Sequence, residues 1–179
     1  LPRPHGAVAD GNTLNTRSIN TAIDALSKKG GGVVLVPQGL WLTGPIVLKN
    51  NINLHLAPGS TLLFTADKNE YPLVEANWEG IPQMRNQSPV SATNATNIAI
   101  TGKGIIDGNG DVWRAVKSDK LTETQWKKKV ASGGVVGDDK KTWYPSEGFL
   151  KGSKMPANPG AIAPDRDAAH HHGERAAGR

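Results

Sequence analysis

The stretch NIAITGKGIIDGNGDVW (residues 97–113) contains two short apolar strands joined by a Gly-Lys-Gly turn, and a glycine-rich corner follows the second strand. The stretch NINLHLAPGSTLL (residues 51–63) repeats the same order of an asparagine, alternating apolar residues, a turn and a second apolar strand. One rung of a β-solenoid has this pattern, and because a rung cannot bury its apolar face alone, rungs must stack. The two repeats therefore predict an all-β solenoid.

Further short apolar runs lie upstream, at residues 33–36, 40–43 and 46–48, and turns of Gly, Pro and Asn separate them. The parallel strands of a doubly wound α/β fold need crossovers of about a dozen residues or more. Only the connection that contains Ile19 has that length. We therefore expect residues 33–106 to form short parallel strands, stacked as an incomplete parallel β-helix.

An amphipathic helix is expected before these strands. Its apolar residues recur at helical spacing and form one stripe: Ile19, Ala22, Ile23 and Leu26. The helix begins near Asn15 or Thr16, either of which can cap it, and the glycines at 30–32 end it. Because nothing nearby in the sequence buries the stripe, we expect the helix to cap the N-terminal end of the solenoid.

Two insertions interrupt the repeat, at about residues 67–94 and 113–150. The first predicts a long ordered loop, and the second contains a short helix from Thr122 to Ala131 with Thr122 as its cap. We expect residues 1–159 to form the N-terminal part of a single β-helix domain. Residues 160–179 have no periodicity and almost no large apolar side chain, so we expect a disordered or aberrant tail.

Composition narrows the classes of function. The formal charge is +5, from 21 basic and 16 acidic residues, and many of the lysines lie between residues 117 and 154. These lysines either cover the solvent-exposed surface of an insertion or attract an acidic polymer. No nucleic-acid motif is present, no segment is apolar enough to span a membrane, and the absence of cysteine removes disulfide and thiolate chemistry.

Several motifs occur together in a specific order: GAVADG (residues 6–11), LNT (14–16), GGGVVLVP (30–37), NLHL (53–56) and DGNG (107–110) followed by Trp113. In this order they resemble the N-terminal part of glycoside hydrolase family 28, the pectin-degrading polygalacturonases. The bacterial branch resembles the chain most, because WEG (78–80) and WYPSE (143–147) have counterparts there. The resemblance covers about residues 6–159.

The resemblance implies a right-handed parallel β-helix and hydrolysis of the glycosidic bonds of galacturonan, an acidic polysaccharide. It implies a secreted or periplasmic protein, with no cofactor and no metal, and the signal peptide is not in the chain. In the family, aspartates on mid-solenoid strands perform acid and base catalysis, helped by Gly-His-Gly and Arg-Ile-Lys motifs. None of these motifs occurs here. We therefore expect an N-terminal fragment of a polygalacturonase-like hydrolase that is itself inactive, with no catalytic residue.

Trp78, Glu79 and Arg85 are the candidate substrate-binding residues. An aromatic ring can stack on a sugar, and an arginine can hold a galacturonate carboxylate through two parallel hydrogen bonds. Anchoring of the loop is the alternative explanation. Two other patterns are interpreted as non-functional: Asp138-Asp139 as a surface turn followed by lysines, and the histidines at 170–172 as too weak a set to form a metal site.

A function from another class also fits the solenoid pattern. Non-catalytic β-helices that bind or build structures, such as phage tail-fibre or adhesin modules, share the GAVADG opening and a capping helix. The corner at residues 107–113 and the WYP motif at 143–145 favour the hydrolase. The sequence leaves the oligomeric state open.

Overall fold

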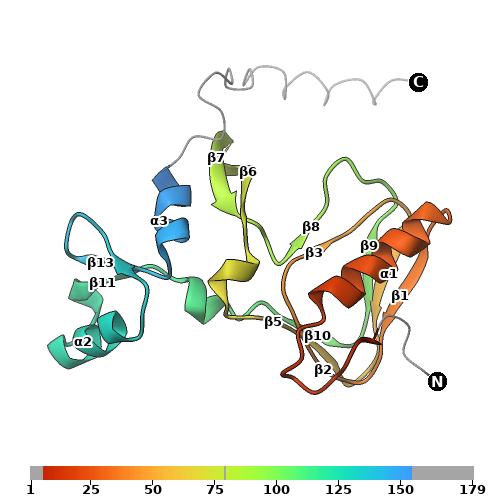
Figure 1. The fold of residues 1–179 in the computed structure, drawn as a ribbon, viewed down its shortest axis with the longest axis horizontal. Coiled ribbons are helices and arrows are strands. Elements are labelled where there is room, and N and C mark those ends of the chain that lie inside the picture. Colours follow the sequence, from red (N-terminus) through yellow and green to blue (C-terminus); the bar gives the residue numbers. More distant parts are fainter. Residues whose placement is uncertain (1–5, 79, 155–179) are drawn as a thin grey trace, which may run out of the picture.

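The solenoid consists of short strands that wind one above another in successive rungs (Figure 1). The computed structural model describes residues 6–78 and 80–154, so the expected tail at 160–179 and its histidines lie outside the described residues. The strands of the first rung are β1 (Gly32–Val36), β2 (Gly39–Thr43) and β3 (Ile46–Val47). Those of the second rung are β4 (Ile52–Leu56), β5 (Ser60–Phe64) and β8 (Val90–Ser91), and the third rung contributes β9 (Ala99–Gly102) and β10 (Ile105–Asp107).

Equivalent strands of successive rungs pair in parallel. The sheets have the orders β1-β4-β9, β2-β5-β10 and β3-β8. The two quoted repeats supply rungs two and three, since Leu54 of β4 lies opposite Ile100 of β9 and Leu62 of β5 opposite Ile106 of β10. The predicted stack of short parallel strands is therefore confirmed.

Apolar side chains form columns inside this stack, and their burial shows which end is covered. In one column Val34 is 8% exposed, Leu54 0% and Ile100 46%. In the next, Trp41 is 4% exposed, Leu62 0% and Ile106 43%. Burying a leucine side chain contributes about 2 kcal/mol, so the second rung gains most from the stack. The inward-facing side chains of the third rung form an apolar surface at one end of the solenoid.

The asparagine that begins each repeat shapes the corner of its rung. Asn51 and Asn97 both adopt a positive φ, 60° and 54°, which asparagine tolerates better than most residues. Asn97 Nδ2 donates a 2.9 Å hydrogen bond to Asn51 Oδ1, so the two corners are tied directly. The backbone amide of Thr96 also donates to Asn50 Oδ1, at 2.7 Å. The asparagines therefore align one rung with the next.

Helix α1 (Thr16–Lys28) lies beside the first rung and contributes Ile19 and Ile23 to the solenoid core. Asn15 occupies the N-cap position, but neither its side chain nor that of Thr16 caps the helix as the sequence predicted. Asn15 is 1% exposed, and its amide bonds to Val8, Thr13 and Leu42 instead, while Thr16 Oγ1 accepts a hydrogen bond from the Gly44 amide. These side chains satisfy backbone groups of the first rung and of the segment before the helix, so they are not available to cap it.

The first insertion forms an antiparallel hairpin rather than the expected loop. Its strands are β6 (Leu73–Trp78) and β7 (Ile81–Asn86), preceded by the 3₁₀ helix η2 (Lys68–Glu70). The chain then returns to the solenoid as β8, which pairs with β3.

The second insertion leads to a small unit at the end of the molecule away from the solenoid strands (Figure 1). Its elements are η3 (Gly110–Trp113), β11 (Val116–Lys117), η4 (Ser118–Lys120), α2 (Glu123–Ala131), β12 (Val135–Val136) and β13 (Thr142–Tyr144), with β13 between β11 and β12. Helix α2 and its Thr122 cap confirm the predicted short helix. Helix α3 (Glu147–Lys154) was not predicted, and it packs against β7 of the hairpin.

The glycine-rich corner leads out of the solenoid. Asp107 Oδ1 accepts a 2.8 Å hydrogen bond from the Asn109 amide, at the end of the exposed strand β10. Trp113 follows in η3 and packs against the segment that enters the hairpin. It contacts Tyr71, with ring centroids 4.7 Å apart, because the corner continues into the second insertion.

Replacement of Asn15 by alanine is expected to destabilise the protein by about 3 kcal/mol, since buried backbone groups left without a partner cost about 1–3 kcal/mol each. Urea unfolding of the two proteins measures this difference. Asn12→Ala is the control, because Asn12 is exposed and its side chain makes one long bond of 3.4 Å to the Asp10 carbonyl. Equal stabilities of Asn15→Ala and Asn12→Ala would contradict the role assigned to Asn15.

Replacement of Gly102 by alanine is expected to destabilise the third rung by at least about 2 kcal/mol, because strained positive-φ backbone costs about 1–3 kcal/mol before any clash. Gly102 has a φ of 105°, and an added Cβ would overlap the carbonyl oxygen of Leu56. Gly108→Ala is the matched control, since nothing lies within 4 Å of a Cβ there. Thermal unfolding compares the two variants, and an equal effect would refute the argument.

Candidate functional site

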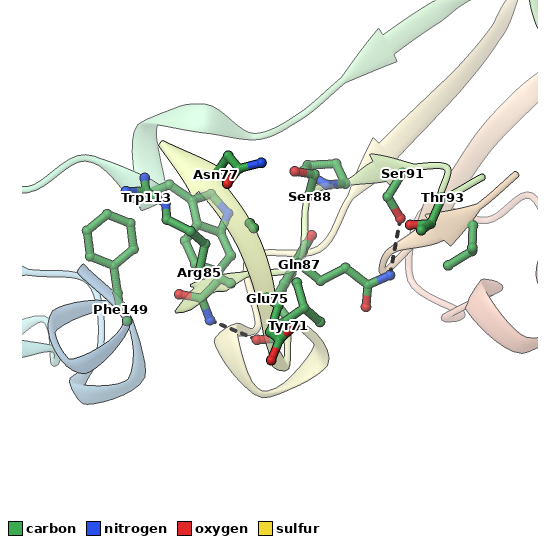
Figure 2. Close-up of a pocket in the computed structure, with 16 residues that line it drawn as sticks. Tyr71, Glu75, Asn77, Arg85, Gln87, Ser88, Ser91, Thr93, Trp113 and Phe149 are labelled. Carbon is green, nitrogen blue, oxygen red and sulfur yellow. Dashed lines mark hydrogen bonds between the residues drawn. The ribbon is translucent and has the colours of Figure 1, made fainter. Parts of the chain in front are cut away.

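A cavity of about 630 Å³ lies between the solenoid and the first insertion (Figure 2). One side is the short sheet of β3 and β8, and the opposite side is the β6–β7 hairpin. Residues from η3 and α3 close one end. The lining residues are Val47, Tyr71, Val74, Glu75, Ala76, Asn77, Arg85, Asn86, Gln87, Ser88, Pro89, Ser91, Thr93, Trp113, Phe149 and Gly152.

Backbone and side-chain hydrogen bonds at the base of the hairpin hold this side of the cavity in place. The amide of Gln87 donates to the Pro72 carbonyl at 2.8 Å, and Asn86 Nδ2 donates to the Tyr71 carbonyl at 2.8 Å. Gln87 Nε2 also lies 3.4 Å from Ser91 Oγ on β8. The hairpin is therefore fastened both to the segment that enters it and to the solenoid sheet.

Tyr71 is the central support of the cavity. Tyr71 is 2% exposed, and its hydroxyl donates a 2.9 Å hydrogen bond to the carbonyl of Thr65, the residue that follows β5. Burial, together with the negative charge of Glu70, raises the pKa of Tyr71 to about 12. The phenol therefore stays protonated and keeps its bond to the solenoid at neutral pH.

An aromatic cluster forms one end of the cavity. Trp113 meets Tyr71 edge-on at 4.7 Å between centroids, and it lies 6.2 Å from the ring of Phe149 on α3. Among the described residues, Trp113 Nε1 is a buried donor with no hydrogen-bond acceptor. A buried donor without a partner costs about 1–3 kcal/mol, so an acceptor supplied by a ligand would remove this cost.

Arg85 and Glu75 are the charged residues of the cavity. Arg85 lies on β7 and is half-buried, and its Nη1 donates a 2.8 Å hydrogen bond to Gln83 Oε1. In Figure 2, Trp113 and Phe149 lie on one side of Arg85, and the polar side chains of Ser91 and Thr93 lie on the other. Glu75 is exposed, and it is the one carboxylate among the lining residues.

Of the three predicted substrate-binding residues, Arg85 lines the cavity. Trp78 ends β6, where its backbone pairs with Ile81, so it lies at the tip of the hairpin. Glu79 lies outside the described residues. The predicted binding role of all three stays a proposal.

The Asp138-Asp139 pair lies in a turn of the second insertion. Asp139 Oδ2 accepts a 2.6 Å hydrogen bond from the Thr142 hydroxyl, and its Oδ1 accepts bonds from the Lys141 and Thr142 amides. These bonds, the Thr142 hydroxyl above all, lower the pKa of Asp139. A general acid needs a raised pKa, so Asp139 has the chemistry of a turn residue.

Sequence reasoning missed several residues of the cavity, including Asn77, Gln87 and Phe149. Phe149 comes from an unpredicted helix, and contact between residues 71, 113 and 149 has no local signal in the sequence. The alternation of apolar Val74, Ala76 and Trp78 with polar Glu75 and Asn77 in β6 was the signal that could have revealed a strand of the hairpin.

No group of three or more His, Asp or Glu side chains is arranged to hold a metal ion within residues 6–78 and 80–154. Over the same residues, every helix is too short or too polar to cross a bilayer.

Comparison with known proteins finds similar sequences and similar structures among polygalacturonases. The chain is 37% identical over 146 residues to an exo-poly-alpha-D-galacturonosidase of Dickeya chrysanthemi, a match that covers 74% of this chain and 24% of that protein. Among solved structures, a hyperthermoactive exopolygalacturonase from Thermotoga maritima superposes with a TM-score of 0.57 at 43% identity, over 61% of this chain and 25% of the other.

A family 28 exopolygalacturonase from Yersinia enterocolitica superposes with a TM-score of 0.52 at 28% identity, over 78% of this chain and 23% of that one. No family model matches the chain. The chain spans about a quarter of the length of the curated relatives that it matches. Over that shared part, the chain is a homologue of the polygalacturonases of glycoside hydrolase family 28.

Proposed function

We propose that this chain supplies the N-terminal portion of a polygalacturonase-like hydrolase acting on pectin, and that its own contribution is a pocket for a galacturonate unit. The cavity beside the β3–β8 sheet supports this proposal, because it combines an arginine, several amide and hydroxyl groups and an aromatic wall. A guanidinium stays charged and matches the geometry of a carboxylate, while an aromatic face suits the apolar face of a sugar ring.

The same cavity argues for binding rather than cleavage within this chain. An inverting glycosidase needs two carboxyl groups about 6.5–9.5 Å apart, one as acid and one as base. Among the described lining residues there is one carboxylate, Glu75. We therefore propose that the acid and base of the hydrolase come from outside this sequence. A non-catalytic binding module is the second candidate, and the single carboxylate favours it.

The proposal also includes the handedness of the solenoid and the place of α1. We infer that the solenoid is right-handed, as strand crossovers in parallel sheets almost always are, and that α1 caps its N-terminal end. The burial of Ile19 and Ile23 against the core supports the capping role. The division into one β-helix domain with insertions at about 67–94 and 113–150, and secretion to the periplasm or beyond, belong to the same proposal.

Arg85→Ala is expected to weaken binding of digalacturonate by about 10- to 100-fold, because a hydrogen bond to a charged group contributes about 1.5–3 kcal/mol. Isothermal titration calorimetry measures the affinity. Arg17→Ala is the matched control, since Arg17 is an exposed arginine on α1 that does not line the cavity. A digalacturonate affinity that Arg85→Ala leaves unchanged would overturn the proposed pocket.

The purified chain is expected to release no reducing ends from polygalacturonate, since its cavity lacks a pair of carboxylates. An Asp138→Asn/Asp139→Asn double variant is expected to behave in the same way. A reducing-sugar assay with an active polygalacturonase as positive control checks both proteins. Turnover by the chain that disappears in the double variant would show that the turn aspartates are catalytic after all.

A further inference from the structure

Two segments of the chain have the sequence Asn-X-Ser/Thr, the pattern to which transferases attach N-linked sugars. They are Asn86-Gln87-Ser88 and Asn94-Ala95-Thr96. A pattern of three residues is too short to identify a site by itself, so the surroundings of each asparagine decide whether it can carry a sugar. In this structure the surroundings of the two asparagines differ.

Asn86 is engaged in the structure of the hairpin. It is the last residue of β7, it is half-buried, and it lines the cavity. Its Nδ2, the atom to which a sugar would be bonded, donates a 2.8 Å hydrogen bond to the Tyr71 carbonyl. A sugar on Nδ2 would have no room beside this close contact. The folded chain therefore protects Asn86 from modification.

Asn94 has the opposite surroundings. It lies in the connection between β8 and β9, and its side chain is exposed. Its φ is 51°, a left-handed conformation that asparagine tolerates better than most residues. The Asn94 side chain makes no hydrogen bond with any of the residues that the structure describes. A sugar on its Nδ2 would therefore displace no contact of the fold.

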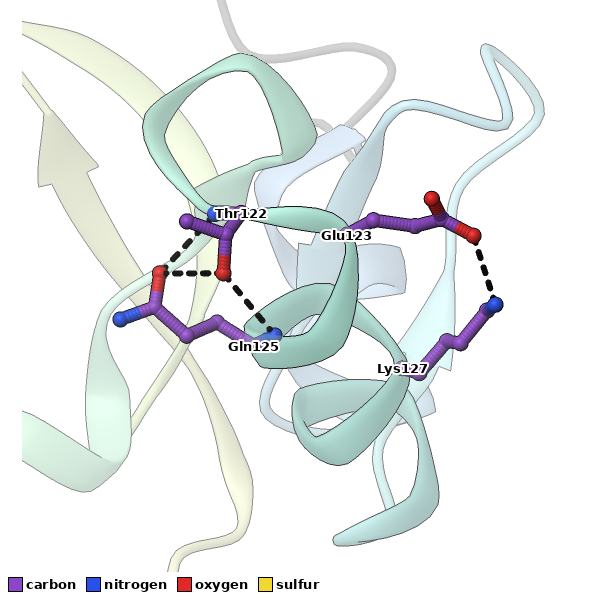
Figure 3. Close-up of polar contacts among 4 residues, drawn as sticks. All are labelled: Thr122, Glu123, Gln125 and Lys127. Carbon is purple, nitrogen blue, oxygen red and sulfur yellow. Dashed lines mark hydrogen bonds and ion pairs between the residues drawn. The ribbon is translucent and has the colours of Figure 1, made fainter.

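Other exposed carboxamide groups have structural partners. In the capping box at the start of α2, Gln125 Oε1 accepts hydrogen bonds from the amide and the hydroxyl of Thr122, at 2.9 and 3.1 Å (Figure 3). Asn97 is exposed like Asn94, but its Nδ2 bonds to Asn51. Asn97 also lacks a serine or threonine two residues later, where Ala99 stands. It is therefore an internal negative control for Asn94.

The connection that contains Asn94 is held by its neighbours. The Thr96 amide donates to Asn50 Oδ1 at 2.7 Å, and the Asn51 amide donates to the Thr96 carbonyl at 3.0 Å. These bonds use the backbone of Thr96 and leave the Asn94 side chain out. A chain modified at Asn94 would therefore keep the corner that aligns the second and third rungs.

We propose that Asn94 of the folded chain is an acceptor site for an N-linked sugar and that Asn86 is not. In the transfer, Asn94 Nδ2 loses one proton and forms a bond to C1 of a sugar, while the diphosphate that activated the sugar leaves C1. That diphosphate belongs to a nucleotide or to a lipid carrier. The site is independent of the proposed pocket, and it would add a bulky, solubilising group to the surface of the solenoid.

The test incubates the purified 179-residue chain with a soluble N-glycosyltransferase and UDP-glucose, and peptide mass spectrometry identifies the modified residues. We expect one hexose on Asn94 and none on Asn86 or Asn97. Asn94→Asp is expected to abolish the labelling while keeping the positive φ, which aspartate also tolerates. Thr96→Val is expected to lose the labelling and Thr96→Ser to keep it, because the pattern requires a hydroxyl at that position.

A peptide of residues 80–92 shows whether the fold or the local sequence protects Asn86. We expect the peptide to be labelled, and its refusal would overturn the protection assigned to the fold. Equal labelling of Asn86 and Asn94 in the folded chain would do the same.

A second arm translates the chain behind a secretory leader in the presence of microsomes, which supply a lipid-linked donor. We expect Asn94 to be modified there as well. Modification of Asn94 in this arm alone would mean that transfer precedes folding, and would overturn acceptance by the folded chain. An unmodified Asn94 in both arms would overturn the site.

Discussion

Each rung of the solenoid depends on its neighbours to bury its apolar side chains. Leu54 and Leu62 of the second rung are fully buried because a rung lies on each side of them, whereas Ile100 and Ile106 of the third rung are 46% and 43% exposed. Stacking also fixes register, since a shift of one residue would turn the apolar columns outward. The corner bond between Asn51 and Asn97 holds that register. Strands β3 and β8 of this stack form one side of the cavity, and the hairpin between β5 and β8 forms the opposite side.

The features that could be predicted from sequence are those that give a periodic pattern of apolar residues, or a capping residue, within a short segment. The alternation around Leu54 and Ile100 revealed the parallel strands, the stripe through Ile19 and Ile23 revealed α1, and Thr122 marked the start of α2. The role of Asn15 could not be found in this way, because its partners Val8 and Leu42 meet only in the folded rung. The cavity depends likewise on Tyr71, Trp113 and Phe149, which are far apart in the sequence.

In the proposed function, the two insertions and the solenoid each supply part of the pocket for a galacturonate unit. The hairpin supplies Arg85 and encloses the cavity, while η3 and α3 supply the aromatic end that Tyr71 supports. The residues that line the cavity thus come largely from insertions beside a regular stack of strands, an arrangement found in many proteins whose function is carried by loops on a rigid scaffold.

The most direct test of the account is an NMR titration of the chain with digalacturonate, followed through backbone amide and indole N–H signals. The account predicts that the shifts concentrate on Arg85, Gln87, Ser91 and the indole of Trp113, all of which line the cavity. Resonances of α1, such as that of Arg17, would stay in place. Shifts centred on the exposed outer face of β1 and β4, with the cavity unaffected, would contradict it.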